Sequence, residues 1–234
     1  SLTVDAGRDV TFTAATSIAG PVTVAAARNI AAGTLSATGS ALSLTANNGA
    51  ITGNQLTSGT ATLTARRGTS VAADAGSITL AGLTTTAGNA TLAADARIAL
   101  TAVNAGGIFS AATVSGAISI GSLTASGASI IDAGRAIGAS DDEGDVEIGS
   151  ISGTTSLTVD AARDVRFATD ASVAGPVTVT AARDIDAASL TASNALLSLT
   201  ANAGAITANA LAGAGTNLTA RRGASAAPDA GSIS

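Results

Sequence analysis

The stretch Ser1-Leu-Thr-Val-Asp-Ala-Gly-Arg-Asp-Val10 decides the fold, because it returns as Ser156-Leu-Thr-Val-Asp-Ala-Ala-Arg-Asp-Val165. The match continues without a gap to Ser234, so residues 1–155 form one long repeat and residues 156–234 form the first half of the next. A unit of about 155 residues is much longer than one supersecondary unit of a repeat protein, so we expect a shorter period inside it.

A period of about 20 residues lies within the long repeat. Triplets of the kind Leu2-Thr-Val4, Val22-Thr-Val24 and Leu42-Ser-Leu44 recur at this step, and further first strands are expected near residues 62, 91, 109, 129, 157, 177, 197 and 217. These positions predict about eleven coils, with about seven in each long repeat. At a strand spacing of about 4.8 Å, seven coils would advance about 34 Å along a rod.

The two copies of the repeat show which positions face the core. Val10 and Phe12 correspond to Val165 and Phe167, whereas Thr11 between them is replaced by Arg166. Residues two apart on a strand share a face, so the apolar positions point inward and the variable ones outward. Each coil reads as three short strands, about residues 2–5, 10–13 and 17–19 in the first, and helical periodicity is nearly absent. The sequence therefore predicts an all-β solenoid.

Composition limits the core and the partners. Hydrophobic residues make up 46% of the chain but aromatic residues 1%, so we expect a thin tube filled by Ala, Val, Leu and Ile. The net charge is −5 and the chain contains no lysine, which argues against a nucleic-acid partner. No apolar run approaches the roughly 20 residues that cross a bilayer, so membrane insertion is not expected.

Both ends of the sequence fall inside a repeat. Solenoids need polar terminal caps, and neither end has a segment of that kind. We therefore expect the chain to be a segment of a much longer polypeptide.

The phrases Leu2-Thr-Val-Asp-Ala-Gly-Arg-Asp-Val10, Val22-Thr-Val-Ala-Ala-Ala-Arg-Asn-Ile30 and Leu42-Ser-Leu-Thr-Ala-Asn-Asn-Gly-Ala-Ile51 resemble the repeats of filamentous haemagglutinin-type exoproteins, over nearly the whole chain. The resemblance implies a right-handed parallel β-helix and secretion through an outer-membrane partner, as in two-partner secretion. It also implies a role in adhesion, biofilm formation or contact-dependent competition.

Two segments interrupt the short period, residues 65–76 and residues 132–145, and the first recurs at residues 220–231. We expect them to be loops that leave the tube on one face. Arg66 and Arg67 in the first, with Arg221 and Arg222 in its second copy, are candidates for lateral contacts with acidic loops of a neighbouring rod.

The second insertion carries the one dense acidic group of the chain, Asp141, Asp142, Glu143 and Asp145. Carboxylate oxygens near a glycine turn are what Ca²⁺ prefers, so the group is a weak calcium candidate, and a solvated acidic loop is the alternative. Together with Glu147 it also resembles the paired carboxylates of polysaccharide-cleaving enzymes, for which a charged turn is again the alternative. No other cofactor is expected.

Two further surface patterns are open to more than one interpretation. Arg8, Arg28, Arg163 and Arg183 recur at equivalent places beside Asp5, Asp9, Asp160, Asp164 and Asp184, which predicts an ion-pair ladder or, alternatively, a glycan-binding row. Rows of outward hydroxyls at Thr3, Thr23 and Ser43, and at Thr158, Thr178 and Ser198, would suit an ice-binding face, although Thr is also a good strand former.

We therefore expect a structural segment of a long bacterial fibre that is extracellular or on the cell surface, acting as an adhesin stalk or a self-associating filament. Its partners would be like chains in fibres or bundles, with host or matrix glycans as a further possibility. We do not expect an enzyme, because the chain has no His, Cys, Tyr or Lys. The alternatives are a glycan-binding or glycan-cleaving β-helix and an ice-binding solenoid.

Overall fold

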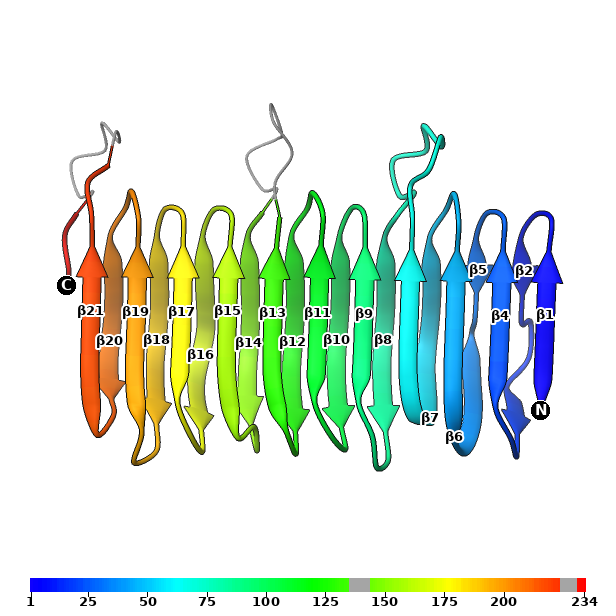
Figure 1. Ribbon diagram of the computed structural model, residues 1–234, viewed down its shortest axis with the longest axis horizontal. Coiled ribbons are helices and arrows are strands. Elements are labelled where there is room, and N and C mark those ends of the chain that lie inside the picture. Colours follow the sequence, from blue (N-terminus) through cyan, green and yellow to red (C-terminus); the bar gives the residue numbers. More distant parts are fainter. Residues whose placement is uncertain (135–143, 224–230) are drawn as a thin grey trace.

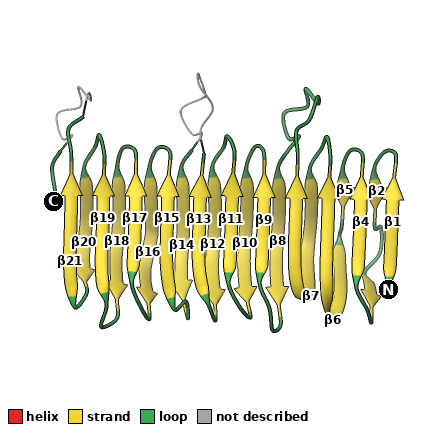
Figure 2. Cartoon of the chain, viewed as in Figure 1, coloured by secondary structure: helices red, strands yellow, loops and turns green. Residues whose placement is uncertain are grey.

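The computed structural model describes residues 1–134, 144–223 and 231–234. Within these ranges the chain forms parallel strands and no helix, and the strands stack side by side along a rod (Figure 1; Figure 2). Successive coils lie about 20 residues apart, as the pairing of Leu2 with Val22 shows. The predicted all-β parallel solenoid is confirmed. The described residues include no helix long and apolar enough to span a membrane.

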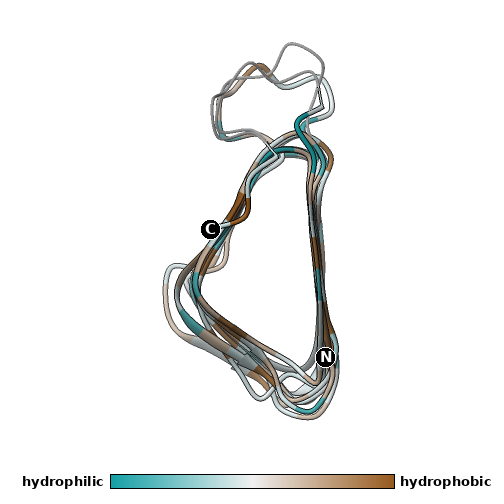
Figure 3. Ribbon diagram, turned by 90° about the vertical axis from the view of Figure 1, so that its left-hand side faces the viewer, coloured by the Kyte–Doolittle hydropathy of each residue, from teal (hydrophilic) through white to brown (hydrophobic). Residues whose placement is uncertain are grey.

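Seen along its axis, the rod has a roughly triangular cross-section (Figure 3). We call the three walls of each coil its first, second and third sides, in chain order. The strands of the first side are β1 (Leu2–Ala6), β4 (Val22–Ala26), the end of β6 (Thr34–Ala46), the end of β7 (Ile51–Ala65), β9 (Ala90–Ala94), β11 (Phe109–Thr113), β13 (Ala128–Ala133), β15 (Ser156–Ala161), β17 (Val177–Ala181), β19 (Leu196–Ala201) and β21 (Gly215–Ala220).

The second and third sides are usually made by one bent strand. In the first two coils the second and third sides are formed by separate strands. β6 and β7 each continue from the third side of one coil into the first side of the next. The remaining strands are β2 (Val10–Thr11), β3 (Thr16–Ile18), β5 (Ile30–Ala31), β8 (Ile78–Thr85), β10 (Ile98–Ala105), β12 (Ile118–Ala125), β14 (Val146–Ser152), β16 (Val165–Val173), β18 (Ile185–Ala192) and β20 (Ile206–Ala212). We number the coils 1 to 11 by their first-side strands, β1 to β21.

The register follows the predicted period with a one-residue offset at three coils. Leu42 pairs with Ala61, Ala61 with Ala90, and Leu197 with Thr216, whereas the sequence predicted starts near 62, 91 and 217. The offset arises because Leu63 points inward, so that Thr62 beside it must point outward. A shift by one residue would turn every side chain of the strand to the opposite face.

Ala, Val, Leu and Ile fill the core as expected, together with the largest buried side chains, Phe109 and Phe167. Several polar side chains also lie inside the tube, among them the pair Ser129 and Thr154. Ser129 stacks between Phe109 and Leu157, and its hydroxyl lies 2.9 Å from that of Thr154, with which it shares a hydrogen bond. Because that bond satisfies both hydroxyl groups, the core tolerates them at low cost.

The insertions fall at one corner of the triangle, between the first and second sides. Ala61 and its partner Ala90 are 29 residues apart, and Ser129 and Leu157 are 28 residues apart, against the usual step of about 20. The first insertion, predicted at residues 65–76, occupies residues 66–77 between β7 and β8 and leaves the tube at this corner (Figure 3). Parts of the other two predicted insertions, residues 135–143 and 224–230, lie outside the described residues, but their flanks lie at the same corner.

Candidate functional site

Charged residues gather at the corner between the first and second sides, which we call the arginine corner. The described arginines of this corner are Arg8, Arg28, Arg66, Arg67, Arg97, Arg163, Arg183, Arg221 and Arg222. Arg166 is the one described arginine that lies elsewhere, on the outward face of the second side. The corner is therefore the most highly charged feature of the described surface.

A ladder of Asp and Asn side chains connects successive coils at the arginine corner. The backbone N–H of Asn29 donates to Asp9 Oδ1 at 3.0 Å, and the N–H of Ala50 donates to Asn29 Oδ1 at 2.9 Å. The second repeat builds the same ladder, in which the N–H of Asp184 donates to Asp164 Oδ1 and that of Ala205 to Asp184 Oδ1. Each side chain thus satisfies a turn N–H that has no strand partner.

In each repeat the coil after the ladder has a glycine at the corner, Gly49 or Gly204, because a side chain would not fit there. A Cβ atom on Gly49 would lie 2.6 Å from the carbonyl carbon of Arg28 and 2.7 Å from its oxygen, next to Asn29 Oδ1. Gly204 has the same surroundings, with the Arg183 carbonyl and Asp184 Oδ1 in place of those groups. An Asp or Asn followed about 20 residues later by Gly-Ala is a sequence signal for this ladder. The ladder is absent from the predictions made from the sequence.

Ion pairs accompany the ladder, and they confirm part of the predicted one. Arg28 contacts Asp9 at 3.1 Å, Arg163 contacts Asp164 at 3.4 Å, and Arg183 contacts Asp164 at 3.5 Å. Arg163 is the most buried of these arginines, with 13% of its side chain exposed, and it also contacts Asp145 at 3.5 Å. The pairs Arg28–Asp9, Arg183–Asp164 and Arg163–Asp145 join neighbouring coils, whereas Arg163 and Asp164 lie next to each other in one coil.

Three other members of the predicted ladder do not join it. Asp5 and Asp160 form no ion pair among the described residues, because strand alternation points them outward on the first side, away from the corner. Arg8 likewise forms no ion pair with any described residue, although its charge is among the influences that lower the pKa of Asp9.

Two carboxyl groups of the corner have shifted pKa values, in opposite directions. Burial raises the pKa of Asp145, against the opposing effects of the Asp164 N–H and of Arg163. The hydrogen bond from the Asn29 N–H is the largest influence on Asp9, and it lowers the pKa of this exposed carboxyl. The two ladders therefore respond differently to acid.

The calcium candidate is only partly described. Asp141, Asp142 and Glu143 lie outside the described residues. Asp145 lies in the corner ladder, where its Oδ1 accepts the N–H of Asp164 at 3.1 Å. In the described part of the chain no three acidic groups come together as a metal site would require. The calcium site stays a prediction.

The structure gives Arg66 and Arg67 different surroundings. The backbone N–H of Arg67 donates to Asp95 Oδ2 at 2.9 Å, and its Nε donates to the Ala75 carbonyl at 3.3 Å, so Arg67 holds the first insertion together. Arg66 is exposed and forms no ion pair with any described residue. Arg221 and Arg222 are exposed at the equivalent corner, seven coils along the rod. Lateral contact through these arginines stays a prediction.

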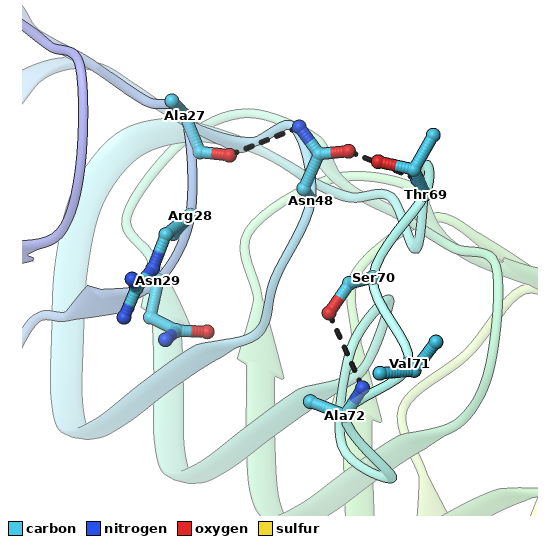
Figure 4. A pocket seen from close by; sticks show the side chains of 8 residues that line it. All are labelled: Ala27, Arg28, Asn29, Asn48, Thr69, Ser70, Val71 and Ala72. Atoms are coloured by element: carbon cyan, nitrogen blue, oxygen red, sulfur yellow. Dashed lines mark hydrogen bonds between the residues drawn. The ribbon is translucent and has the colours of Figure 1, made fainter.

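The first insertion overhangs the corner and encloses a pocket of about 500 Å³ (Figure 4). Asn48 connects the two walls of the pocket, because its Nδ2 donates to the Ala27 carbonyl at 3.2 Å and its Oδ1 accepts the N–H of Thr69 at 3.1 Å. The tip residue Val71 is fully exposed. Arg28 also lines this pocket, but its guanidinium is paired with Asp9.

A second charged ladder crosses the second side in the later coils. Arg166 lies between Glu147 at 3.7 Å and Asp186 at 3.9 Å, and all three side chains are more than half exposed. In the first repeat the places of Arg166 and Asp186 are taken by Thr11 and Ala31. Glu147, which the sequence grouped with the acidic cluster, is therefore part of an exposed ion-pair ladder.

The predicted hydroxyl rows point outward on the first side. Thr3 pairs with Thr23 and Thr23 with Ser43, and the row recurs at Thr158 and Thr178. Hydroxyl residues also form rows on the third side, which is expected from the strand propensity of Thr. The ice-binding interpretation therefore has no distinctive face to support it.

Comparison of the chain with family models, with curated proteins and with solved structures gives no match.

Proposed function

We propose that the chain is a stiff structural segment of a long bacterial fibre, extracellular or attached to the cell surface, that serves as an adhesin stalk or a self-associating filament. The role is mechanical rather than catalytic. Its resemblance to filamentous haemagglutinin-type repeats supports this, and so does the rod-like stacking of the coils.

The observation that carries the proposal is the junction between the two long repeats. Asp132 of the first repeat pairs with Asp160 of the second, and Ala133 pairs with Ala161, in the same register that joins coils within a repeat. Leu157 and Val159 are buried on the coil that precedes them. One long repeat therefore continues into the next through parallel pairing of the same kind, with the Ser129–Thr154 pair in the core at the junction, so that rod length grows with repeat number.

The proposal is tested in the source cells with an antibody raised against this chain. Immunogold electron microscopy is expected to label filaments outside the cell envelope. Label confined to the cell interior would contradict the proposal.

Glycan binding is a second candidate, favoured by a shallow groove along the rod between the second and third sides. Two adjoining depressions of about 390 and 330 Å³ share Gly53, Asn54 and Thr79, and no charged residue lines either. Such a groove suits a neutral linear glycan more than an acidic one. A glycan array probed with the purified chain tests this, with Asn54→Ala and Thr79→Ala as variants that should lose any signal.

A further inference from the structure

We propose that the first side of the rod binds a second copy of this chain, packed antiparallel about a two-fold axis that crosses the rod between coils 5 and 6. This inference deepens the proposed function, since it rests on the rod and assigns its self-association a face and a register.

The first side is straight in cross-section (Figure 3) and presents two rows of outward side chains, which together we call the flat face. The row nearer the start of the strands contains Thr3, Thr23, Ser43, Thr62, Thr91, Ser110, Ile130, Thr158, Thr178, Ser198 and Asn217. The row nearer the arginine corner contains Asp5, Ala25, Thr45, Thr64, Ala93, Ala112, Asp132, Asp160, Thr180, Thr200 and Thr219. Nearly all are small, so a flat partner can approach closely.

The two rows of the flat face carry three charged side chains, Asp5, Asp132 and Asp160, and the arginine corner borders the face. Asp132 and Asp160 are stacked on each other in coils 7 and 8, and both are exposed. Arg66 borders the face at coil 4. None of Arg66, Asp132 and Asp160 forms an ion pair with any described residue, and the three to four coils between Arg66 and the two carboxylates, about 14 to 19 Å, prevent a contact within one chain.

A two-fold axis between coils 5 and 6 brings these charges together. The axis runs parallel to the strands, so it keeps the arginine corners of the two copies on the same side and reverses the rod direction. Coil 4 then faces coil 7 of the second copy, so that Asp132 of the second copy faces Thr64. Arg66 lies two residues beyond Thr64 on the same outward face, where its long side chain reaches toward that carboxylate, twice by symmetry. Asp160 faces Thr45 and Asp5 faces Thr200, so no two carboxylates of the flat faces meet.

The centre of this arrangement is shaped for close contact. Ala93 and Ala112, in coils 5 and 6, form the floor of a depression of about 210 Å³ that Arg66 and Val114 border. Val114 and, in coil 7, Ile130 are exposed by 69% and 45%, which is unusual for this surface. In the dimer Ile130 faces the Thr62 methyl group of the second copy, so that apolar area is buried beside the ion pairs.

The facing area is that of a standard specific interface. Coils 1 to 10 of the two copies face one another and cover about 48 Å along the rod, and a strand of five or six residues covers about 17 to 20 Å across it, or about 900 Å² from each copy. The total of about 1,800 Å² is within the range of specific interfaces, and because its ion pairs lie at the exposed edge we expect a dimer that salt weakens.

Sedimentation velocity of the full chain tests the proposal through a charge exchange. The native chain is expected to show a concentration-dependent monomer–dimer equilibrium. Arg66→Asp and Asp132→Arg should each weaken it by at least about tenfold, because each places like charges opposite one another, and the double variant should restore it. Arg97→Asp is the matched control, because Arg97 is an exposed arginine of coil 5 beside the second side, and it should leave the dimer unchanged.

The direction of packing is measured with a spin label, which is straightforward because the chain has no cysteine. A label on Thr23→Cys, in coil 2, would face coil 9 of the second copy, seven coils or about 34 Å from its own equivalent. Parallel copies would place the two labels about 10 Å apart, the distance between packed sheets.

A chain that stays monomeric at every concentration, a double variant as weak as the single ones, or a label distance near 10 Å would overturn the proposal. A monomer whose small-angle scattering still shows a rod would leave the proposed function intact. Loss of the rod itself would refute both.

Discussion

Replacing Gly49 by Ala tests the close packing of coils at the arginine corner. The new methyl group would lie 2.6 Å from the Arg28 carbonyl carbon and 2.7 Å from its oxygen, well inside van der Waals contact. These are backbone atoms held by coil stacking, so a side-chain rotation cannot relieve the overlap. Forced overpacking of this kind typically lowers the free energy of unfolding by about 1 to 3 kcal/mol, and we expect the upper half of that range.

The chain provides a matched control in Gly7, which lies at the same corner of coil 1. A Cβ atom there would have no neighbour within 4 Å, and the second repeat has Ala162 at the equivalent position. Gly7→Ala should therefore leave stability unchanged or raise it by up to about 1 kcal/mol through the unfolded state. Gly49, by contrast, is matched by Gly204 in the second repeat.

Urea unfolding followed by circular dichroism measures both variants, and hydrogen exchange locates the effect. In Gly49→Ala the amide of Ala50, which donates to Asn29 Oδ1, should exchange faster. The additional change Asn29→Ala should not rescue the variant, because the overlap with the Arg28 backbone remains. Equal stability of Gly49→Ala and Gly7→Ala would refute the reasoning.

Three further predictions follow from the core and the ladders. Phe167→Ala should cost about 3 to 5 kcal/mol of unfolding free energy, because Phe167 is 1% exposed, and Phe12→Ala at the equivalent but partly buried place should cost less, as paired urea melts would show. The pKa of Asp145 is raised in the folded state, so the native state binds more protons than the unfolded state. The contribution of Asp145 to stability is therefore largest in acid and falls as pH rises through the folded pKa. The stability of the native chain should fall relative to that of Asp145→Asn as pH rises, and a difference that stays constant with pH would contradict this. Arg163→Ala should destabilise by about 1.5 to 3 kcal/mol, because it leaves the partly buried Asp145 without its arginine and Asp164 with Arg183 alone. Arg166→Ala, in an exposed ladder, should cost at most about 1 kcal/mol, and equal thermal shifts would contradict this.

The sequence was sufficient to predict the architecture because the chain contains its own comparison. Phe12 and Phe167 identify an inward position while Thr11 and Arg166 identify an outward one, and alternation extends these assignments along the strand. The predicted start of the first-side strand in coil 4 was one residue too late, at Thr62 instead of Ala61. Ala and Thr are both compatible with either face of a strand. Only the inward side chain of Leu63 distinguishes the two registers.

The surface was harder to predict, because its contacts join residues about 20 apart whose exact stacking depends on the register. Asp5 lies close to Arg8 in the sequence, yet strand alternation points it onto the flat face, whereas Asp9 lies in the turn and contacts Arg28 of the next coil. The ladder formed by Asn29 and Ala50 likewise requires the turns of two coils to be placed together. A search for Asp or Asn followed by Gly-Ala one coil later would have found it.

The most direct measurement of the central claim adds one more long repeat to the chain. A variant with a second copy of residues 1–155 inserted before Ser156 should form a longer rod of the same thickness. Small-angle X-ray scattering should then show the maximum dimension increased by about 34 Å, seven coils at about 4.8 Å each, with an unchanged cross-sectional radius. A thicker particle, or a length that does not increase by this step, would contradict a continuous solenoid whose length is determined by its repeats.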